Sequence, residues 1–205
     1  MSDTPVGGAY AASEHVENER GELTRLAADT AIDVRAYLEA TTTVASGTSP
    51  EVALPIVLLA VSQVLVAGAR LGAIGDVVPT ERFEPDSGPE PDVDPLHGAL
   101  SNVLTGLDEY ADVVDPVVSA EVVHGSLSGD LATIASDLSH GLRHFEAGRV
   151  DEALWWWQFS YLSTWGVRAT TALRVLQSML GHLRLDVDAE TVADAEFEAL
   201  HSQQG

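Results

Sequence analysis

An uncharged apolar run is the feature that most restricts the fold of this 205-residue chain. The run, VALPIVLLAVSQVLVAGA, covers residues 52–69 and contains no Asp, Glu, Lys or Arg. A helix that is apolar on every side must be covered by protein or by lipid. Pro55 near its start, Ser62 and Gln63 in its middle and acidic residues beyond both ends disfavour insertion into a membrane. We therefore expect a buried central helix, with a membrane span as the alternative.

All four tryptophans of the chain lie in a second segment, which is predicted to form one long helix over 151–184. Apolar residues recur along one side of it at helical spacing: Leu154, Trp155, Leu162, Trp165, Ala169, Ala172, Leu173, Leu176, Leu180 and Leu183. The opposite side carries small hydroxyl side chains, which allow another backbone to approach closely. We expect this helix to pair with residues 52–69 at the centre of a bundle.

Amphipathic periodicity predicts further helices on either side of this pair. Apolar residues at spacings of three and four indicate helices over 23–38, 96–114 and 128–147, with Ser128 as the N-terminal cap of the last. The expected fold class is therefore all-α, a single-domain bundle of about six helices with a central apolar helix pair.

The domain boundaries follow from composition. The sequence PTERFEPDSGPEPDVDP, residues 79–95, holds five of the nine prolines and is predicted to be an extended linker inside the bundle domain, 18–186. Residues 1–17 are expected to be disordered. The acidic segment 187–205 is expected to form a short helix or to be mobile.

The chain is strongly acidic, with 32 Asp and Glu against ten basic residues and a formal net charge of -22. Proteins are attracted to phosphate backbones and anionic lipid by clustered Lys and Arg, so we expect no direct contact with nucleic acid or membrane. The charge is typical of a soluble surface and also suits a basic protein partner. There is no cysteine, which excludes disulfides and thiolate chemistry. Together with an N-terminus unlike a signal peptide, this predicts a cytoplasmic protein.

The consecutive tryptophans supply the candidate interaction residues. Three successive helical residues span about 200 degrees, so the three indoles cannot all face the core. Trp156 projects towards the side that carries Val167 and Arg174, while Tyr161 lies beside Trp157. Tryptophan near arginine is typical of interface hot spots, so Trp156 is the candidate exposed anchor. The alternative is that other helices bury Trp156.

Gln158 is a polar residue at the centre of the apolar stripe, where a buried amide needs hydrogen-bond partners. One interpretation is structural: the amide bonds Gln63, Ser62, a tyrosine hydroxyl or a free carbonyl on a neighbouring helix and so fixes the register. The other is that Gln158 lines a small polar pocket beside the indoles and binds a ligand.

A polar face on the predicted helix 128–147 is a candidate metal site. Asp130, Asp137, His140 and His144 cluster within about 80 degrees of one another. Histidines four residues apart can bind one ion together with a carboxylate, but further ligands would have to come from another helix. A solvent-exposed polar face explains the same pattern, so we assign no metal or other cofactor.

Four segments of the chain resemble a known family. EALWWWQFSYLSTWGVRATTALRVL, with LPIVLLAVSQVLVAGARLGAI, DVVPTERFEPDSGPEPDVD and DLATIASDLSHGLRHFEAG, is similar to the actinobacterial branch of the domain of unknown function 5063 family. The resemblance covers most of residues 20–186, and its most specific matches are Trp155, Trp157, Phe159, Trp165, Gly166, Ala172, Leu173 and Arg174. It implies a soluble bacterial helical domain without an assigned activity.

Two further implications come from the same resemblance. Family members often carry a histidine where Val167 and Arg168 stand here, which removes one ligand from any shared metal or catalytic site. Genes of the family often neighbour a recombination mediator gene, so a DNA-processing protein is implied as one candidate partner.

The sequence supports two functional hypotheses. It contains no Walker-type glycine loop, G-x-S-x-G elbow, HExxH motif or cysteine nucleophile, so no catalytic residue is assigned and enzymatic activity is left open. The first hypothesis is a non-enzymatic protein-interaction or adaptor module that binds a protein partner or a second copy of itself. The alternative is a helical-bundle enzyme or small-ligand or metal binder, with its site near Gln158 or the Asp137, His140 and His144 face.

Overall fold

The computed structural model describes residues 7–79, 92–115 and 119–202, with side chains described over 17–79, 92–113 and 121–185. Its elements are α1 (Gly7–Ala45), the 3-10 turn η1 (Pro50–Val52), α2 (Ala53–Ala73), α3 (Asp94–Val103), β1 (Glu109–Asp115), β2 (Ser119–Ser126), α4 (Leu127–Glu146), α5 (Val150–Ser160), the π-helical turn η2 (Tyr161–Trp165) and α6 (Gly166–Ser202). The expected all-α class is confirmed, with one two-stranded hairpin added in the part of the chain that is described.

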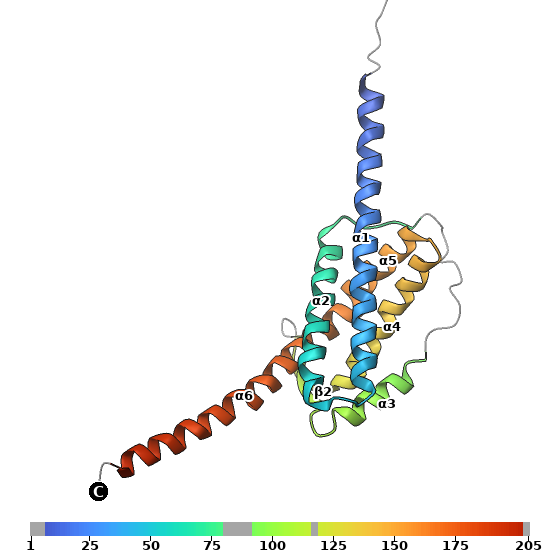
Figure 1. Ribbon diagram of the computed structural model, residues 1–205. Coiled ribbons are helices and arrows are strands. Elements are labelled where there is room, and N and C mark those ends of the chain that lie inside the picture. The colour runs from blue at the N-terminus through green and yellow to red at the C-terminus, as the bar shows by residue number, and fades with distance from the viewer. Residues whose placement is uncertain (1–6, 80–91, 116–118, 203–205) are drawn as a thin grey trace, which may run out of the picture.

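The helices form a bundle from which two of them project (Figure 1). Helices α1, α2 and α4 stand side by side, and the continuous run of α5, η2 and α6 crosses behind α1 and α2. Helix α1 extends beyond one end of the bundle and α6 beyond the other. The two apolar helices expected to pair do so, since α2 packs against α5 and α6.

Three predicted segments, 1–17, 79–95 and 187–205, compare differently with the structure. Helix α1 begins at Gly7, within the segment 1–17, and residues 1–6 lie outside the described residues. Helix α6 continues to Ser202 through the acidic C-terminal segment. Most of the predicted linker, 80–91, also lies outside the described residues.

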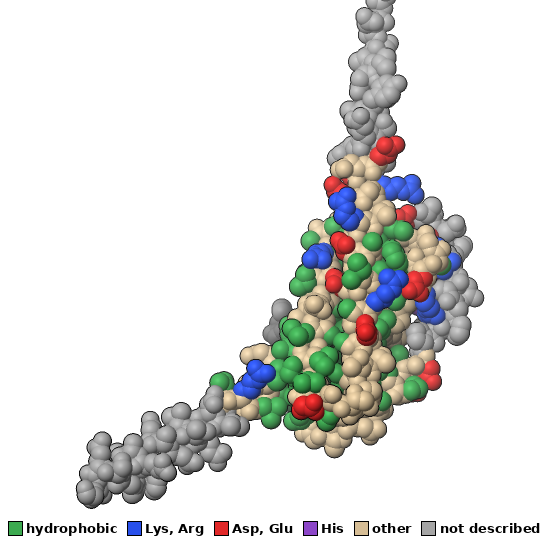
Figure 2. All heavy atoms as spheres, viewed as in Figure 1, with side chains coloured by type: hydrophobic (Ala, Val, Ile, Leu, Met, Phe, Trp, Pro, Cys, Tyr) green, Lys and Arg blue, Asp and Glu red, His purple; other side chains and the backbone are tan. Residues whose placement is uncertain are grey.

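In the part of the chain that the structure describes, helix α2 is covered by protein on one side only. Its inward residues Val57, Val61 and Val64 are fully buried, whereas Leu59 and Val66 are exposed on the outer side. Figure 2 shows hydrophobic side chains gathered along this outer face. Within the described residues, the helical stretch Pro50–Ala73 is long and apolar enough to cross a membrane by length and composition, a test that core helices also pass.

Trp157 is the largest side chain buried between α4 and α5. It is fully buried, and its Nε1 donates a hydrogen bond to the Leu138 carbonyl at 3.0 Å. The indole fits because residue 141 is glycine: a Cβ there would lie 2.3 Å from Trp157 Nε1. The α4–α5 contact thus requires a glycine on one helix opposite an indole on the other.

The predicted helix 96–114 is wrong beyond α3, where the chain forms a β-hairpin. The chain turns at Gly106, whose φ of +83° is a conformation that side chains rarely adopt. Strands β1 and β2 then pair antiparallel, with Tyr110 opposite Gly125 and an irregularity between Val113 and Asp115. The apolar spacing that resembled a helix belongs to a segment rich in β-branched valines, which favour strands.

The N-terminal cap of α4 is Ser126 rather than the predicted Ser128. Ser126 Oγ accepts a hydrogen bond from the Gly129 N–H at 3.1 Å. The carboxylate of Asp108 in turn accepts hydrogen bonds from the Ser128 N–H and Oγ, both at 2.7 Å. Partial burial alone would raise the pKa of Asp108, but these hydrogen bonds outweigh it and lower the pKa below its usual value.

Candidate functional site

The β-hairpin is attached to α6 through Asp112 of β1. The Asp112 carboxylate accepts a hydrogen bond from Thr171 Oγ1 at 2.9 Å and one from Arg174 Nη2 at 2.6 Å. These contacts lower the pKa of Asp112, although its slight desolvation acts in the opposite direction. The carboxylate is therefore ionised at neutral pH. It links β1 to Thr171 and Arg174, which lie about one turn apart on α6.

A second carboxylate, Asp130 of α4, holds the same strand through Tyr110. Only 4% of Asp130 is exposed, and its carboxylate accepts hydrogen bonds from Tyr110 Oη and, at 2.7 Å, from Arg168 Nη1. Burial and the adjacent Asp130 raise the pKa of the Tyr110 hydroxyl, so the hydroxyl stays protonated and donates. A Cβ at residue 125 would lie 2.4 Å from the Tyr110 ring, so Gly125 makes room for it.

An open cavity of about 750 Å³, which we call the hairpin groove, lies between β1 and the helical run that contains η2 and α6. Its mouth is apolar, since Leu162 and Val167 are 62% and 64% exposed. Three of its polar residues, Asp112, Thr171 and Arg174, are those that hold the hairpin. The groove is lined by Asp112, Val113, Tyr161, Leu162, Gly166, Val167, Thr170, Thr171 and Arg174.

The π-helical turn η2 shapes one wall of this groove. At its end the Gly166 N–H bonds the Tyr161 carbonyl, five residues earlier, and a Cβ on residue 166 would lie 2.3 Å from that oxygen. A π turn holds more residues than an α-helical turn and shifts the phase of the side chains that follow. Leu162, predicted to be in the core stripe, lies within this turn and is exposed in the groove, while Trp165 at its end stays buried.

The structure divides the predicted binding residues among three places. Tyr161, Val167 and Arg174 all line the hairpin groove. Gln158 faces α2, and Trp156 lies against α4. The five residues therefore do not form one site.

The expectation that Trp156 is an exposed anchor is wrong. Trp156 is half-buried, its Nε1 donates to the Asp137 carbonyl at 3.1 Å, and its indole stacks on His140 with ring centroids 3.9 Å apart. The predicted alternative, cover by another helix, describes it better. Trp156 thus holds α5 to α4.

Gln158 has the structural role that was one of its two interpretations. Its Nε2 donates to the carbonyls of Leu71 at 3.0 Å and Gly75 at 3.2 Å, and its Oε1 accepts from the Val77 N–H at 2.9 Å. These groups belong to the last turn of α2 and the chain that follows it. A side chain of α5 therefore caps α2, and its amide is engaged with backbone rather than lining a polar pocket.

The polar face of α4 is not a solvent-exposed surface, so that expectation is wrong. His144 is fully buried and accepts a hydrogen bond from Arg149 Nε at 3.2 Å. Asp137 accepts one from Thr164 Oγ1 at 2.7 Å. Within the described ranges, no group of three or more His, Asp or Glu side chains is placed to hold a metal ion.

Sequence reasoning missed the hairpin residues Tyr110, Asp112 and Asp130 as a linked set. The first two were assigned to a helix, and the third to a solvent-exposed face. Paired valines on both sides of Pro116 were the available signal, because β-branched pairs around a turn residue are typical of a hairpin.

The fold and the groove define a class of small helical-bundle proteins with one docked β-hairpin. The model of the family described as domain of unknown function (DUF5063) matches residues 22–182. The chain belongs to this family.

No curated protein matches the chain. Among solved structures, protein BF1032 from Bacteroides fragilis is similar at 18% identity, with 77% of this chain and 89% of that chain covered and a TM-score of 0.49.

Proposed function

We propose that this protein is a non-enzymatic interaction module that binds a basic protein partner through the hairpin groove. The observation that carries the proposal is that the groove is open and that two of its lining residues, Leu162 and Val167, are exposed apolar side chains. Exposed apolar patches rimmed by polar groups are typical of protein-binding sites.

The polar groups of the groove argue against chemistry there. Asp112, Thr171 and Arg174 bond one another and hold the hairpin, so they do not converge on a free space as catalytic groups do. The alternative of an enzyme or ligand binder has less support still at Gln158, whose amide is engaged by α2.

The charge of the chain favours a basic partner over a second copy. A net charge of -22 attracts a basic surface and repels an identical chain. A DNA-processing protein, whose nucleic-acid-binding surface is basic, has this chemistry. The composition without cysteine is compatible with an encounter in the cytoplasm, and that location stays a prediction.

A charge placed in the groove tests the proposal. Val167→Asp puts a carboxylate at the groove mouth, and Leu185→Asp is its matched control, because Leu185 is equally exposed on the same helix outside the groove. The wild-type chain should retain basic proteins from a cell extract, Val167→Asp should lose them, and Leu185→Asp should keep them, as quantified by mass spectrometry.

Three results would reject the proposal. They are equal retention by both variants, retained proteins that are not basic, and a wild-type chain that self-associates through the groove in analytical ultracentrifugation.

A further inference from the structure

Strand β1 has an edge to which no other strand is paired among the described residues. The hairpin is a two-stranded sheet in which β1 pairs only with β2. A strand edge carries a row of backbone N–H and C=O groups that can pair with another extended chain. β1 also borders the hairpin groove, whereas no described residue of β2 lines it.

The pairing pattern shows which backbone groups face this edge. The Leu127 N–H donates to the Asp108 carbonyl at 2.8 Å, which places those two residues in a hydrogen-bonded pair. Hydrogen-bonded and non-hydrogen-bonded pairs alternate along an antiparallel ladder. The alternation therefore directs the backbone groups of Ala111 and Val113 away from β2.

Ala111 is the accessible position on this edge. Its side chain is small and exposed, so an approaching chain meets no steric block. The Val113 N–H contacts the Asp112 carboxylate. Over the described ranges, no hydrogen bond reaches the Ala111 backbone from outside the hairpin.

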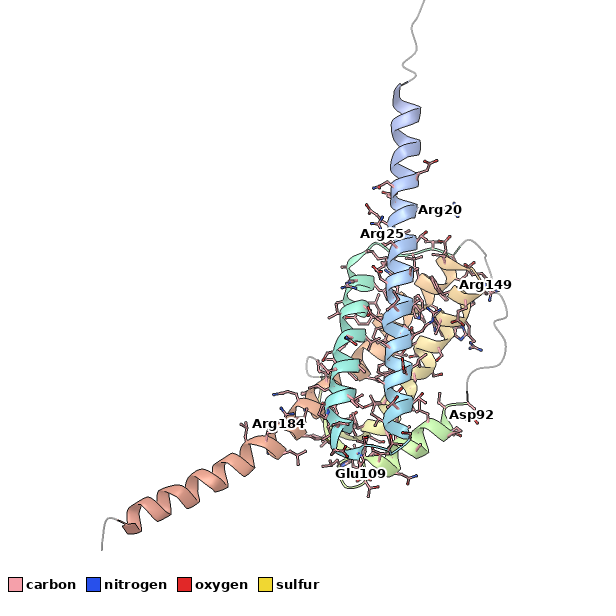
Figure 3. The ribbon with its side chains drawn as sticks, in the orientation of Figure 1. Arg20, Arg25, Asp92, Glu109, Arg149 and Arg184 are labelled. Carbon is pink, nitrogen blue, oxygen red and sulfur yellow. The ribbon has the colours of Figure 1, made fainter. Side chains whose placement is uncertain are left out.

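The charge of the hairpin decides between the possible occupants. Its strands EYADVVD and SAEVVHGS carry four acidic residues and no Lys or Arg, and of the four Asp112 is paired with Arg174 of α6. Figure 3 places Glu109 at the opposite end of the bundle from Arg20, Arg25 and Arg149. A second copy would bring carboxylates against carboxylates, whereas a basic chain would meet opposite charge.

We propose that the partner binds by strand addition, in which an extended basic segment pairs with the free edge of β1 and places an apolar side chain in the hairpin groove. The inference rests on the proposed function and adds the mode of binding. In strand addition the main-chain hydrogen bonds supply affinity, and pockets for alternate side chains supply specificity. Leu162 and Val167 form such a pocket beside the edge.

A synthetic peptide tests the mode without knowledge of the partner. The probe alternates lysine and valine over seven residues, the length of β1, and is titrated into the ¹⁵N-labelled full chain. We expect amide shifts at Ala111 and Val113 and slower hydrogen exchange at Ala111, whose N–H is the free donor of this edge, with no change at Val122 and His124 on the outer edge of β2.

Two control peptides separate backbone pairing from charge attraction. A peptide with the same side chains but with alternate backbone nitrogens methylated lacks the donors, and its affinity should fall by about tenfold or more. A glutamate–valine peptide should also bind more weakly. Equal binding of the methylated peptide, or no binding of the lysine–valine peptide at millimolar concentration, would overturn the inference.

A pair of proline variants tests the edge in the protein itself. Ala111→Pro removes the outward N–H of β1, and His124→Pro removes the corresponding N–H of β2, since Ala111 and His124 are register partners. Circular dichroism and hairpin NMR shifts check that both variants fold. Ala111→Pro should lose peptide binding and His124→Pro should keep it, and the reverse result would contradict strand addition.

The outcomes distinguish this inference from the proposed function. If Val167→Asp loses the cellular partner while Ala111→Pro keeps it, the groove binds but strand addition is wrong. If both variants keep the partner, both proposals are wrong.

Discussion

The α4–α5 contact and the hairpin contact hold their elements by different means. Trp157 is fully buried, and Trp156 stacks on His140, so α4 and α5 are joined by close-packed rings. The hairpin is joined to α4 and α6 chiefly through Asp130 and Asp112, whose arginine partners are about half exposed. Close packing leaves no space for a partner, whereas attachment through a few polar groups leaves an open groove beside them.

The largest expected effect on stability comes from truncating the indole that is packed between α4 and α5. Trp157→Ala removes a fully buried indole and leaves the Leu138 carbonyl without its donor. We expect a loss of about 3–5 kcal/mol in the free energy of unfolding, measured by urea denaturation. Phe159→Ala is the control, because Phe159 is half exposed, and its cost should be below about 1 kcal/mol. Similar costs for the two variants would show that Trp157 is not the packing centre.

A smaller effect is expected where α5 caps α2. Gln158→Leu keeps the volume but leaves the Val77 N–H and the Leu71 carbonyl unsatisfied. The expected cost is about 1–3 kcal/mol in the same measurement. Gln177→Leu changes an exposed glutamine of α6 and should be nearly neutral. A neutral Gln158→Leu would contradict the capping role.

Weakening the contact between the hairpin and α4 should destabilise the hairpin without unfolding the rest of the bundle. Asp130→Ala removes the acceptor of Tyr110 and Arg168 and should cost about 1–2 kcal/mol, since Arg168 can be hydrated when it loses its partner. Hydrogen exchange should quicken in β1 and β2 while the amides around Trp157 stay protected. Uniform loss of protection would show that the two contacts are one cooperative unit.

The smallest effect is an acid dependence at the start of α4. The folded pKa of Asp108 lies below the ordinary 3.8, so its ionised form stabilises the fold above that value. This stabilisation is lost as the pH falls through the folded pKa. Asp108→Asn cannot titrate, so the stability difference between wild type and variant should shrink between neutral pH and about pH 3. A constant difference across that range would contradict the contribution of the ionised carboxylate.

The hairpin shows why part of the candidate site was beyond prediction. Tyr110 and Asp130 are twenty residues apart, and Asp112 and Arg174 are 62 apart. Helical spacing in 96–114 was a local signal that strand pairing overrode, because β-propensity depends on what the strand packs against. Val167 and Arg174 were recognisable as one side of a helix, but Tyr161 was placed apart from them beside Trp157, and the strand that completes the groove was not foreseen.

The sequence by itself determined the helical class, the pairing of two apolar helices and the presence at Gln158 of a buried amide that needs hydrogen-bond partners. These follow from periodicity and from the need of a buried polar group for partners, both of which are local properties of the chain. Only the tertiary structure decided which neighbour covers Trp156 and His144, which carbonyls Gln158 binds and where the groove opens. The spacing of apolar residues predicts which side of a helix is apolar. Which residues pack over its polar side depends on segments that are distant in the chain.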